Sequence, residues 1–207
     1  MHETALPQLG VEGRILEAIV TTSNEDGSIN IAPMGPIVDA SSETLVLRPF
    51  RTSTTYHNLI RTHSGVLHIT DDVLLFAMAA IGKVEPLPEF LSSEPLVLAS
   101  ACRWLKFYVL SVDDSAERSV LIARTTAGAH MREFFGFNRA MHAVIEAAIL
   151  ATRVQLLPPE NLLAELARLE SPVRKTGGAV ELKAFALLRE FINQEVASPC
   201  KAEDQPA

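Results

Sequence analysis

The feature that most constrains the fold of this chain is a change of hydrophobic pattern near residue 126. Before it, short runs rich in β-branched residues alternate with turn residues, which is typical of antiparallel strands. After it, apolar residues recur at helical spacing over 138–156, 162–169 and 180–196. Strands followed by helices, rather than strands alternating with helices, predict an α+β chain.

The first half of the sequence predicts an antiparallel sheet. A strand over 14–22, the turn Asn24-Glu25-Asp26-Gly27 and a strand over 28–37 predict a hairpin. Further strands are expected over 44–47, 66–69, 104–112 and 119–124, helices near 56–60 and over 73–81, and a proline-rich loop over 85–95.

Composition argues against several classes of protein. With 25 acidic and 18 basic residues, the net charge of −7 opposes long-range attraction to nucleic acid. The sequence has neither a basic start followed by an apolar run nor an apolar stretch of membrane-spanning length, so we expect no membrane partner. Cys102 and Cys200 show no metal or disulfide spacing, which favours a cytoplasmic protein.

A polar segment from Arg48 to Asn58 is the strongest indication of a binding site. It places guanidinium groups and several hydroxyls where a predicted strand gives way to a predicted helix. Charged donors, hydroxyls and free helix amides are the groups that bind a phosphate monoester. An equally open alternative is that the hydroxyls only cap the helix while both arginines face solvent. The candidate ligand residues here are Arg48, Pro49, Phe50, Arg51, Thr52, Thr54, Thr55 and Asn58.

A second motif runs from Asn30 to Gly35 and puts small residues and prolines inside a predicted strand. Small side chains let a flat ring approach backbone donors and acceptors. Taken alone, the motif is explained more readily by a β-bulge or an edge strand. The candidate contacts are Asn30, Ala32, Pro33, Met34 and Gly35.

A third motif opens the long predicted helix. Asn138 is placed to cap it, and Arg139, His142, Glu146 and Arg153 recur on one side of it. An internally paired polar stripe explains this pattern more readily than a ligand site does. Asn138 and Arg139 are nevertheless carried forward as candidate ligand contacts.

Other common chemistries lack their motifs. No HExxH or helical histidine pair predicts a metal site, and neither GxSxG nor a cysteine with a positioned histidine predicts covalent catalysis. Neither GxGxxG nor GxxxxGK[ST] is present, so a Rossmann or P-loop site is not supported. We therefore expect no metal and can name no catalytic residue.

The three motifs, in this order, resemble a known family. Asn30 to Gly35 followed by Arg48 to Leu59 is similar to the FMN-binding split barrel of flavin reductases and pyridoxamine-phosphate-oxidase-like proteins. With Phe137 to Arg153 added, most of residues 14–155 resembles the domain-of-unknown-function 447 family of bacteria and archaea. The resemblance implies an α+β chain, an antiparallel split β-barrel that binds FMN through the candidate residues, with a C-terminal helical extension.

The resemblance also carries expectations about organisation and function. It divides the chain into a barrel over 1–126, helices packed on the barrel over 127–200 and a disordered tail over 201–207. It implies an FMN-binding flavoprotein and a homodimer, because split barrels generally place the flavin at the subunit boundary. We expect an oxidoreductase similar to flavin reductases, acting on a small-molecule substrate or electron donor.

Two other functions stay open. The alternative to an enzyme is a protein that holds the flavin for storage, sensing or delivery without turnover. Haem binding is disfavoured, because the phosphate-type segment would have no role in it.

Overall fold

The computed structural model describes residues 6–197, so Cys200 and the tail expected over 201–207 lie outside the described residues. The strands are β1 (Arg14–Ile15), β2 (Ala18–Ser23), β3 (Ile29–Met34), β4 (Ile37–Val38), β5 (Thr44–Leu47), β6 (Ser64–Ile69), β7 (Phe90–Leu91), β8 (Glu94–Leu98), β9 (Arg103–Asp113) and β10 (Val120–His130). The helices are α1 (Thr54–Thr62), α2 (Val73–Ala80), α3 (Arg139–Ala151), α4 (Pro159–Thr176) and α5 (Ala179–Ala197).

The chain forms two compact units. The first comprises residues up to Asp72 together with Val84–Phe135, and it holds all the strands and α1. The second comprises Val73–Lys83 and the chain from Gly136 onward, so α2 belongs with the later helices. The domain boundary expected at residue 126 stays a prediction.

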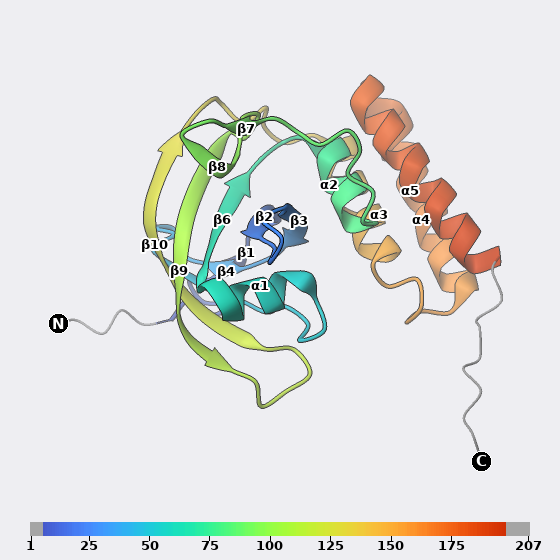
Figure 1. Cartoon of the computed structure of the whole chain (residues 1–207). Helices are drawn as coiled ribbons and strands as arrows, with labels where there is room; N and C mark the ends of the chain where they lie inside the picture. Colours follow the sequence, from blue (N-terminus) through green and yellow to red (C-terminus); the bar gives the residue numbers. More distant parts are fainter. Residues whose placement is uncertain (1–5, 198–207) are drawn as a thin grey trace, which may run out of the picture. The chain divides into compact units, whose positions relative to one another are not determined.

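The first unit is built on an eight-stranded sheet with the order β1-β4-β5-β10-β9-β6-β2-β3. Every neighbouring pair is antiparallel, and the sheet curls, with α1 against β2, β3 and β6 (Figure 1). β2 and β3 form the expected hairpin, in which Thr22 faces Asn30. Its turn contains Gly27 at φ +82°, a conformation that favours glycine.

The core of this unit is apolar and closely packed. Phe107, Leu67 and Leu121 are buried where the central strands meet. Gly65 faces Phe107 across the β6–β9 ladder, and a Cβ at residue 65 would lie 2.7 Å from the ring. The glycine is therefore needed for the ring to pack against the sheet.

Two expectations from the sequence are wrong in detail. The stretch 85–95 is not only a loop, because β7 and the start of β8 form a small hairpin there. β10 continues to His130, past the point where the pattern appeared to become helical, because its second half pairs with residues 103–107 of β9. In both places pairing with distant strands determines the structure, and local composition does not reveal it.

The second unit is helical. Its helices α2, α3, α4 and α5 contact one another through apolar faces that include Val144, Leu166 and Leu188. The Asn138 side chain caps α3 by accepting hydrogen bonds from the amides of Ala140 and Met141. No helix among the described residues is long and apolar enough to cross a membrane.

His68 is a fully buried polar side chain that joins β6 to two neighbours in the first unit. Its Nδ1 lies 3.2 Å from the Ile19 carbonyl oxygen, and its Nε2 accepts a hydrogen bond of 3.1 Å from the Leu98 amide. This arrangement requires a neutral ring with the proton on Nδ1. Burial lowers the pKa of His68 to about 4.

His68 makes stability depend on pH. In the unfolded chain the imidazole has an ordinary pKa of about 6.5, so below that pH the unfolded state binds a proton that the folded state does not. The free energy of unfolding should fall as pH drops from 6.5 to about 4, by about 2–3 kcal/mol from this residue. Urea denaturation of the parent protein and of His68→Gln across this range measures the effect.

The glutamine variant should lose most of that pH dependence, whereas His57→Gln, a change at an exposed residue of α1, should keep it. Equal slopes in the parent and His68→Gln would contradict the assignment. Asp71 does not interfere, since its hydrogen bond and ion pair with Arg132 lower its pKa to about 2.

Candidate phosphate-binding site

The segment from Arg48 to Ser53 links β5 to α1 and is held by its own hydrogen bonds. The Ser53 hydroxyl donates to the Phe50 carbonyl oxygen at 2.8 Å and accepts from the Tyr56 amide at 3.2 Å, so Ser53 is the N-cap. Capping therefore occupies Ser53, while Thr52 and Thr54 remain exposed. Hydroxyls and the free amides of the first helical turn meet at this end of α1.

Arg48 provides the clearest test of whether this segment fits an anion. Its Nε is buried, and it is the one buried side-chain nitrogen or oxygen in residues 6–197 without a hydrogen-bond partner. A buried donor without an acceptor is costly, by about 1–3 kcal/mol. An oxygen of a bound phosphate would supply the missing acceptor, so the residues present fit such a group.

Arg51, three residues further along, is exposed, and its Nη1 donates to the Asp114 carbonyl oxygen at 3.3 Å. With Thr52 and Tyr56 it lines an open pocket of about 620 Å³ beside the N-terminus of α1. Phe50 and Glu117 also border this pocket. Pro49 is buried, and its carbonyl oxygen accepts from the Ser119 amide at 3.1 Å.

A cluster of amide and hydroxyl side chains joins this segment to the β2–β3 hairpin. The Asn30 Nδ2 donates to Thr22 Oγ1 at 3.1 Å and to Thr55 Oγ1 at 3.0 Å. The Asn58 Nδ2 donates to Thr22 Oγ1 at 3.0 Å and to Asn24 Oδ1 at 2.7 Å. The structure thus brings the first two sequence motifs together through Asn30, Thr55 and Asn58.

The rest of the hairpin motif lies on β3, at one end of the sheet order. Ala32, Pro33 and Met34 are half-buried, and Pro33 faces Ile19 of β2. This is the edge strand that the prolines alone would indicate. Gly35 is required by packing, because a Cβ there would lie 2.8 Å from Ile15 Cγ2. An edge strand of small residues leaves room for a flat ring, and ring contact there stays a prediction.

Asn138 and Arg139 belong to the second unit. The Asn138 side chain caps α3 and also donates to the Thr176 carbonyl oxygen at 3.1 Å, so its polar atoms have structural roles. Arg139 is exposed at the start of α3. In the described chain no ion pair joins His142 to Glu146, and the His142 ring instead packs edge-on against Phe137. Ligand contact by Asn138 and Arg139 stays a prediction.

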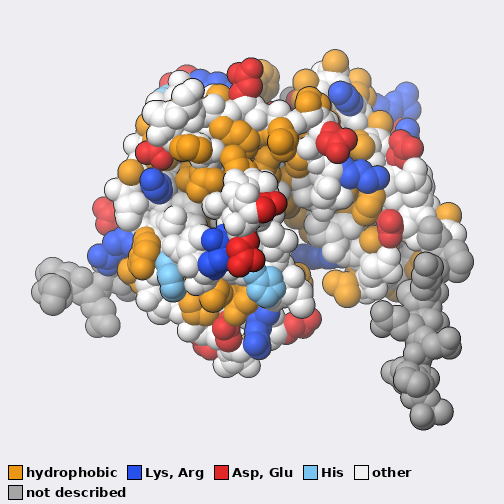
Figure 2. Space-filling model, viewed as in Figure 1, with side chains coloured by type: hydrophobic (Ala, Val, Ile, Leu, Met, Phe, Trp, Pro, Cys, Tyr) orange, Lys and Arg blue, Asp and Glu red, His pale blue; other side chains and the backbone are white. Residues whose placement is uncertain are grey.

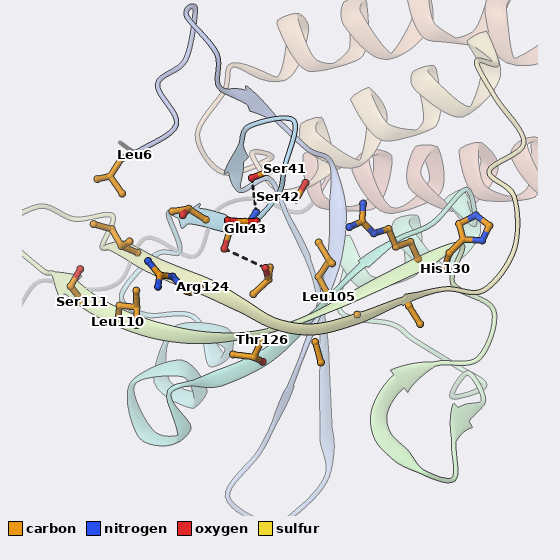
Figure 3. Close-up of a pocket in the computed structure, with 17 residues that line it drawn as sticks. Leu6, Ser41, Ser42, Glu43, Leu105, Leu110, Ser111, Arg124, Thr126 and His130 are labelled. Carbon is orange, nitrogen blue, oxygen red and sulfur yellow. Dashed lines mark hydrogen bonds between the residues drawn. The ribbon is translucent and has the colours of Figure 1, made fainter. Parts of the chain in front are cut away.

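A larger cavity of the first unit lies elsewhere. It is an open trough of about 1330 Å³ along β9 and β10, with Arg124 and Leu110 toward one end and His130 at the other (Figure 3). It shares no residue with the segment from Arg48 to Asn58. Size alone would favour the trough, but the phosphate-type donors lie at the N-terminus of α1.

Charges of both signs are scattered over the face seen in Figure 2.

The arrangement supports binding more directly than it supports any catalytic step. Among residues 6–197, no group of three or more His, Cys, Asp or Glu side chains is placed to hold a metal ion. Burial raises the pKa of the Cys102 thiol, which disfavours the reactive thiolate.

Sequence reasoning missed three residues of this site. Asp114 falls between the strands expected over 104–112 and 119–124, and Thr22 and Asn24 fall in the expected hairpin. Each contacts the segment through a side chain or carbonyl more than 30 positions away in sequence. The acidic pair Asp113-Asp114 could have been expected to bond to a Tyr and an Arg such as Tyr56 and Arg51. A single sequence, however, does not show which turn meets which helix.

The chain is similar to several solved structures. An FMN-bound protein from Methanosarcina mazei is 27% identical, with a TM-score of 0.76, over 88% of this chain and 97% of that one. The flavin reductase of a styrene monooxygenase from Pseudomonas putida S12 is 14% identical, with a TM-score of 0.47, over 56% of this chain and 80% of that one. An FMN-binding protein from Thermus thermophilus is 14% identical, with a TM-score of 0.46, over 63% of this chain and 79% of that one.

The fold class expected from the sequence is confirmed by that first structure: an antiparallel split barrel with C-terminal helices. Family models match the chain in both halves. The N-terminal domain model of the protein of unknown function DUF447 matches residues 16–130, and the C-terminal model matches residues 138–190. The chain therefore belongs to the DUF447 family.

Proposed function

We propose that this chain is a flavoprotein that binds FMN in its first unit. The observation that carries the proposal is the buried Arg48 Nε without an acceptor, in the same strand-to-helix segment as exposed threonine hydroxyls and the first amides of α1. A phosphate monoester accepts hydrogen bonds from all three of these donor types. The FMN-bound relative from Methanosarcina mazei, similar over 88% of this chain, supports the same cofactor.

The proposed roles follow the geometry of the residues. Arg48 holds the phosphate from the β5 side, and Thr52, Thr54 and Arg51 approach it from the turn. The half-buried edge of β3, from Ala32 to Gly35, lies against the flavin ring, with Asn30 fixed by Thr22 and Thr55. Bound FMN supplies hydride and electron transfer, and the chain's own residues bind and orient it.

Replacing Arg48 tests the placement of the phosphate. A charged hydrogen bond contributes about 1.5–3 kcal/mol, so Arg48→Ala should weaken FMN binding by roughly ten- to a hundredfold. Arg51→Ala should have a smaller effect, because that guanidinium is exposed and water weakens its attraction to a phosphate. Both effects are measured by titrating each variant with FMN and with riboflavin and following the change in flavin fluorescence.

Riboflavin lacks the phosphate, so its affinity should scarcely change in either variant. Arg124→Ala, which removes an exposed arginine on β10 outside the segment, is the matched control and should bind FMN like the parent. Equal loss of FMN and riboflavin, or unchanged FMN binding in both variants, would place the phosphate elsewhere. A parent protein that binds neither flavin would overturn the proposed function itself.

We further propose that the flavoprotein is an oxidoreductase that exchanges electrons with a small-molecule donor or substrate. The open surface of β3 supports this, since a ring held at an edge strand can be reached by a second molecule. Anaerobic addition of NADH or NADPH to the FMN-loaded protein should bleach the flavin absorbance near 450 nm, roughly the band that reports on the oxidised ring. A bound flavin that dithionite bleaches, but that neither NADH nor NADPH bleaches, would favour a non-catalytic flavin carrier.

A homodimer is also proposed. Tyr108, Leu110 and Val112 lie close together near the end of β9 and are 47%, 56% and 37% exposed, and the ladder to β10 skips Leu110, which marks a β-bulge there. A second copy covering this end of β9 would remove apolar side chains, above all Leu110, from water.

Light scattering at micromolar concentration should therefore give twice the chain mass. Leu110→Glu should shift the protein toward monomer, because a carboxylate would be buried unpaired in the interface. Leu163→Glu, at a 39% exposed position on α4, is the matched control and should leave the mass unchanged. A monomeric mass for the FMN-loaded parent would contradict the dimer.

A further inference from the structure

Asp114 lies in the turn between β9 and β10 and contacts the candidate phosphate segment. Its Oδ2 accepts a hydrogen bond of 2.8 Å from the Tyr56 hydroxyl on α1. Its Oδ1 accepts one of 2.5 Å from the hydroxyl of Ser119, which is fully buried. One carboxylate therefore fixes the turn to the start of β10 and to the first turn of the helix.

The same turn presents a carbonyl oxygen to Arg51. The Arg51 Nη1 donates to the Asp114 carbonyl oxygen at 3.3 Å, and the guanidinium also interacts with the Tyr56 hydroxyl. A free arginine side chain loses about 2 kcal/mol of rotamer entropy when a ligand immobilises it. A carbonyl that already holds the guanidinium in place reduces that cost.

The Asp114 carboxylate is ionised at neutral pH. Hydrogen bonds from Ser119 and Tyr56 lower its pKa, and the nearby Arg51 charge lowers it further. The bond to Asp114 in turn raises the pKa of the Tyr56 phenol, so Tyr56 stays a donor to the carboxylate. These contacts are mutually consistent over the ordinary pH range.

The neighbouring residue serves as an internal comparison. Asp113 accepts a hydrogen bond of 2.9 Å from the Ser115 amide, within its own turn. In the part of the chain that the structure describes, no hydrogen bond or ion pair joins the Asp113 side chain to Tyr56 or Arg51. Of the two adjacent aspartates, Asp114 is therefore the one that reaches the helix.

We infer that Asp114 is a positioning residue that sets the preference of this site for FMN over riboflavin, by holding the turn whose carbonyl orients Arg51 and by fixing Tyr56. The inference rests on the proposed function, since it concerns the same phosphate site. In this arrangement Asp114 itself does not contact the phosphate. Its two carboxylate oxygens already accept from Tyr56 and Ser119, and its negative charge would repel a phosphate.

A purely structural role for Asp114 makes a different prediction. The strand start is also held by the Ser119 amide on the Pro49 carbonyl oxygen, by a bridge between Phe50 and Arg118, and by the Arg118 guanidinium 4.0 Å from the Phe50 ring centroid. These contacts survive when the carboxylate is removed, so the variant should fold. If Asp114 only stabilised the fold, its loss would affect FMN and riboflavin alike.

The experiment compares Asp114→Ala, Asp114→Asn and Asp113→Ala by titration with FMN and with riboflavin. Asp114→Ala should weaken FMN binding about three- to tenfold and leave riboflavin unchanged. Asp114→Asn should restore FMN binding, because its amide oxygen still accepts from Tyr56 and its Nδ2 can donate to Ser119 Oγ. Asp113→Ala should match the parent for both ligands.

Tyr56→Phe supplies a second line of evidence, since it removes only the hydroxyl that reaches Asp114. Its loss of FMN affinity should not add to that of Asp114→Ala in the double variant. FMN binding in Asp114→Ala that is unchanged or tighter, or a loss equal for both flavins, would overturn the inference while the proposed function stands. Failure of the parent to bind FMN would overturn both.

Discussion

The Thr22 hydroxyl holds the candidate site together. It accepts from Asn30 on β3 and from Asn58 on α1, so one buried oxygen connects the edge strand to the helix. Buried polar groups are costly unless they are paired, and here the amides and hydroxyls satisfy one another. The position of the helix N-terminus relative to the strand follows from this connection, and with it the distance between the proposed phosphate site at α1 and the proposed ring site at β3.

The sheet order explains why these groups can meet. β3 is last in the order and β2 is beside it, so α1 can contact both strands and still leave the outer edge of β3 uncovered by any other strand in the described chain. The β9–β10 hairpin reaches the same helix from the other side, through Asp114. The site is thus built by segments distant in sequence around the start of one short helix.

Local pattern was enough to predict the elements that form this site, and not enough to predict its partners. The hairpin, the strand over 44–47 and the helix after the threonine cluster follow from β-branched runs, turn residues and capping hydroxyls, which act over a few positions. The full length of β10, the β7–β8 hairpin and the contacts of Asp114 depend on pairing with distant residues. The residue types of Ala127-Gly128-Ala129 do not favour a strand. These residues are extended because they pair with β9.

The candidate ligand residues show the same division. Arg48 and Thr55 were identified by residue type, but their environments differ: Thr55 is paired with Asn30, whereas the Arg48 Nε is buried without a partner. Asn138 was identified by the same kind of reasoning, and the structure gives its side chain a capping role. Residue type indicates which chemistry is possible, and only burial and pairing indicate which group still needs a ligand.

Burial and pairing also determine which polar groups lower the stability of the fold. Buried His68 has a partner at each ring nitrogen, and the Thr22 cluster is satisfied internally, so these polar groups cost little in the folded state. The Arg48 Nε is different, since a buried charged donor without an acceptor costs about 1–3 kcal/mol in a fold whose net stability is about 5–15 kcal/mol. A methionine or leucine would fill the same space without that penalty. An arginine there is accounted for if its acceptor is supplied by a bound ligand, and the free helix amides and threonine hydroxyls beside it make an oxygen-rich anion the ligand that satisfies the most donors at once.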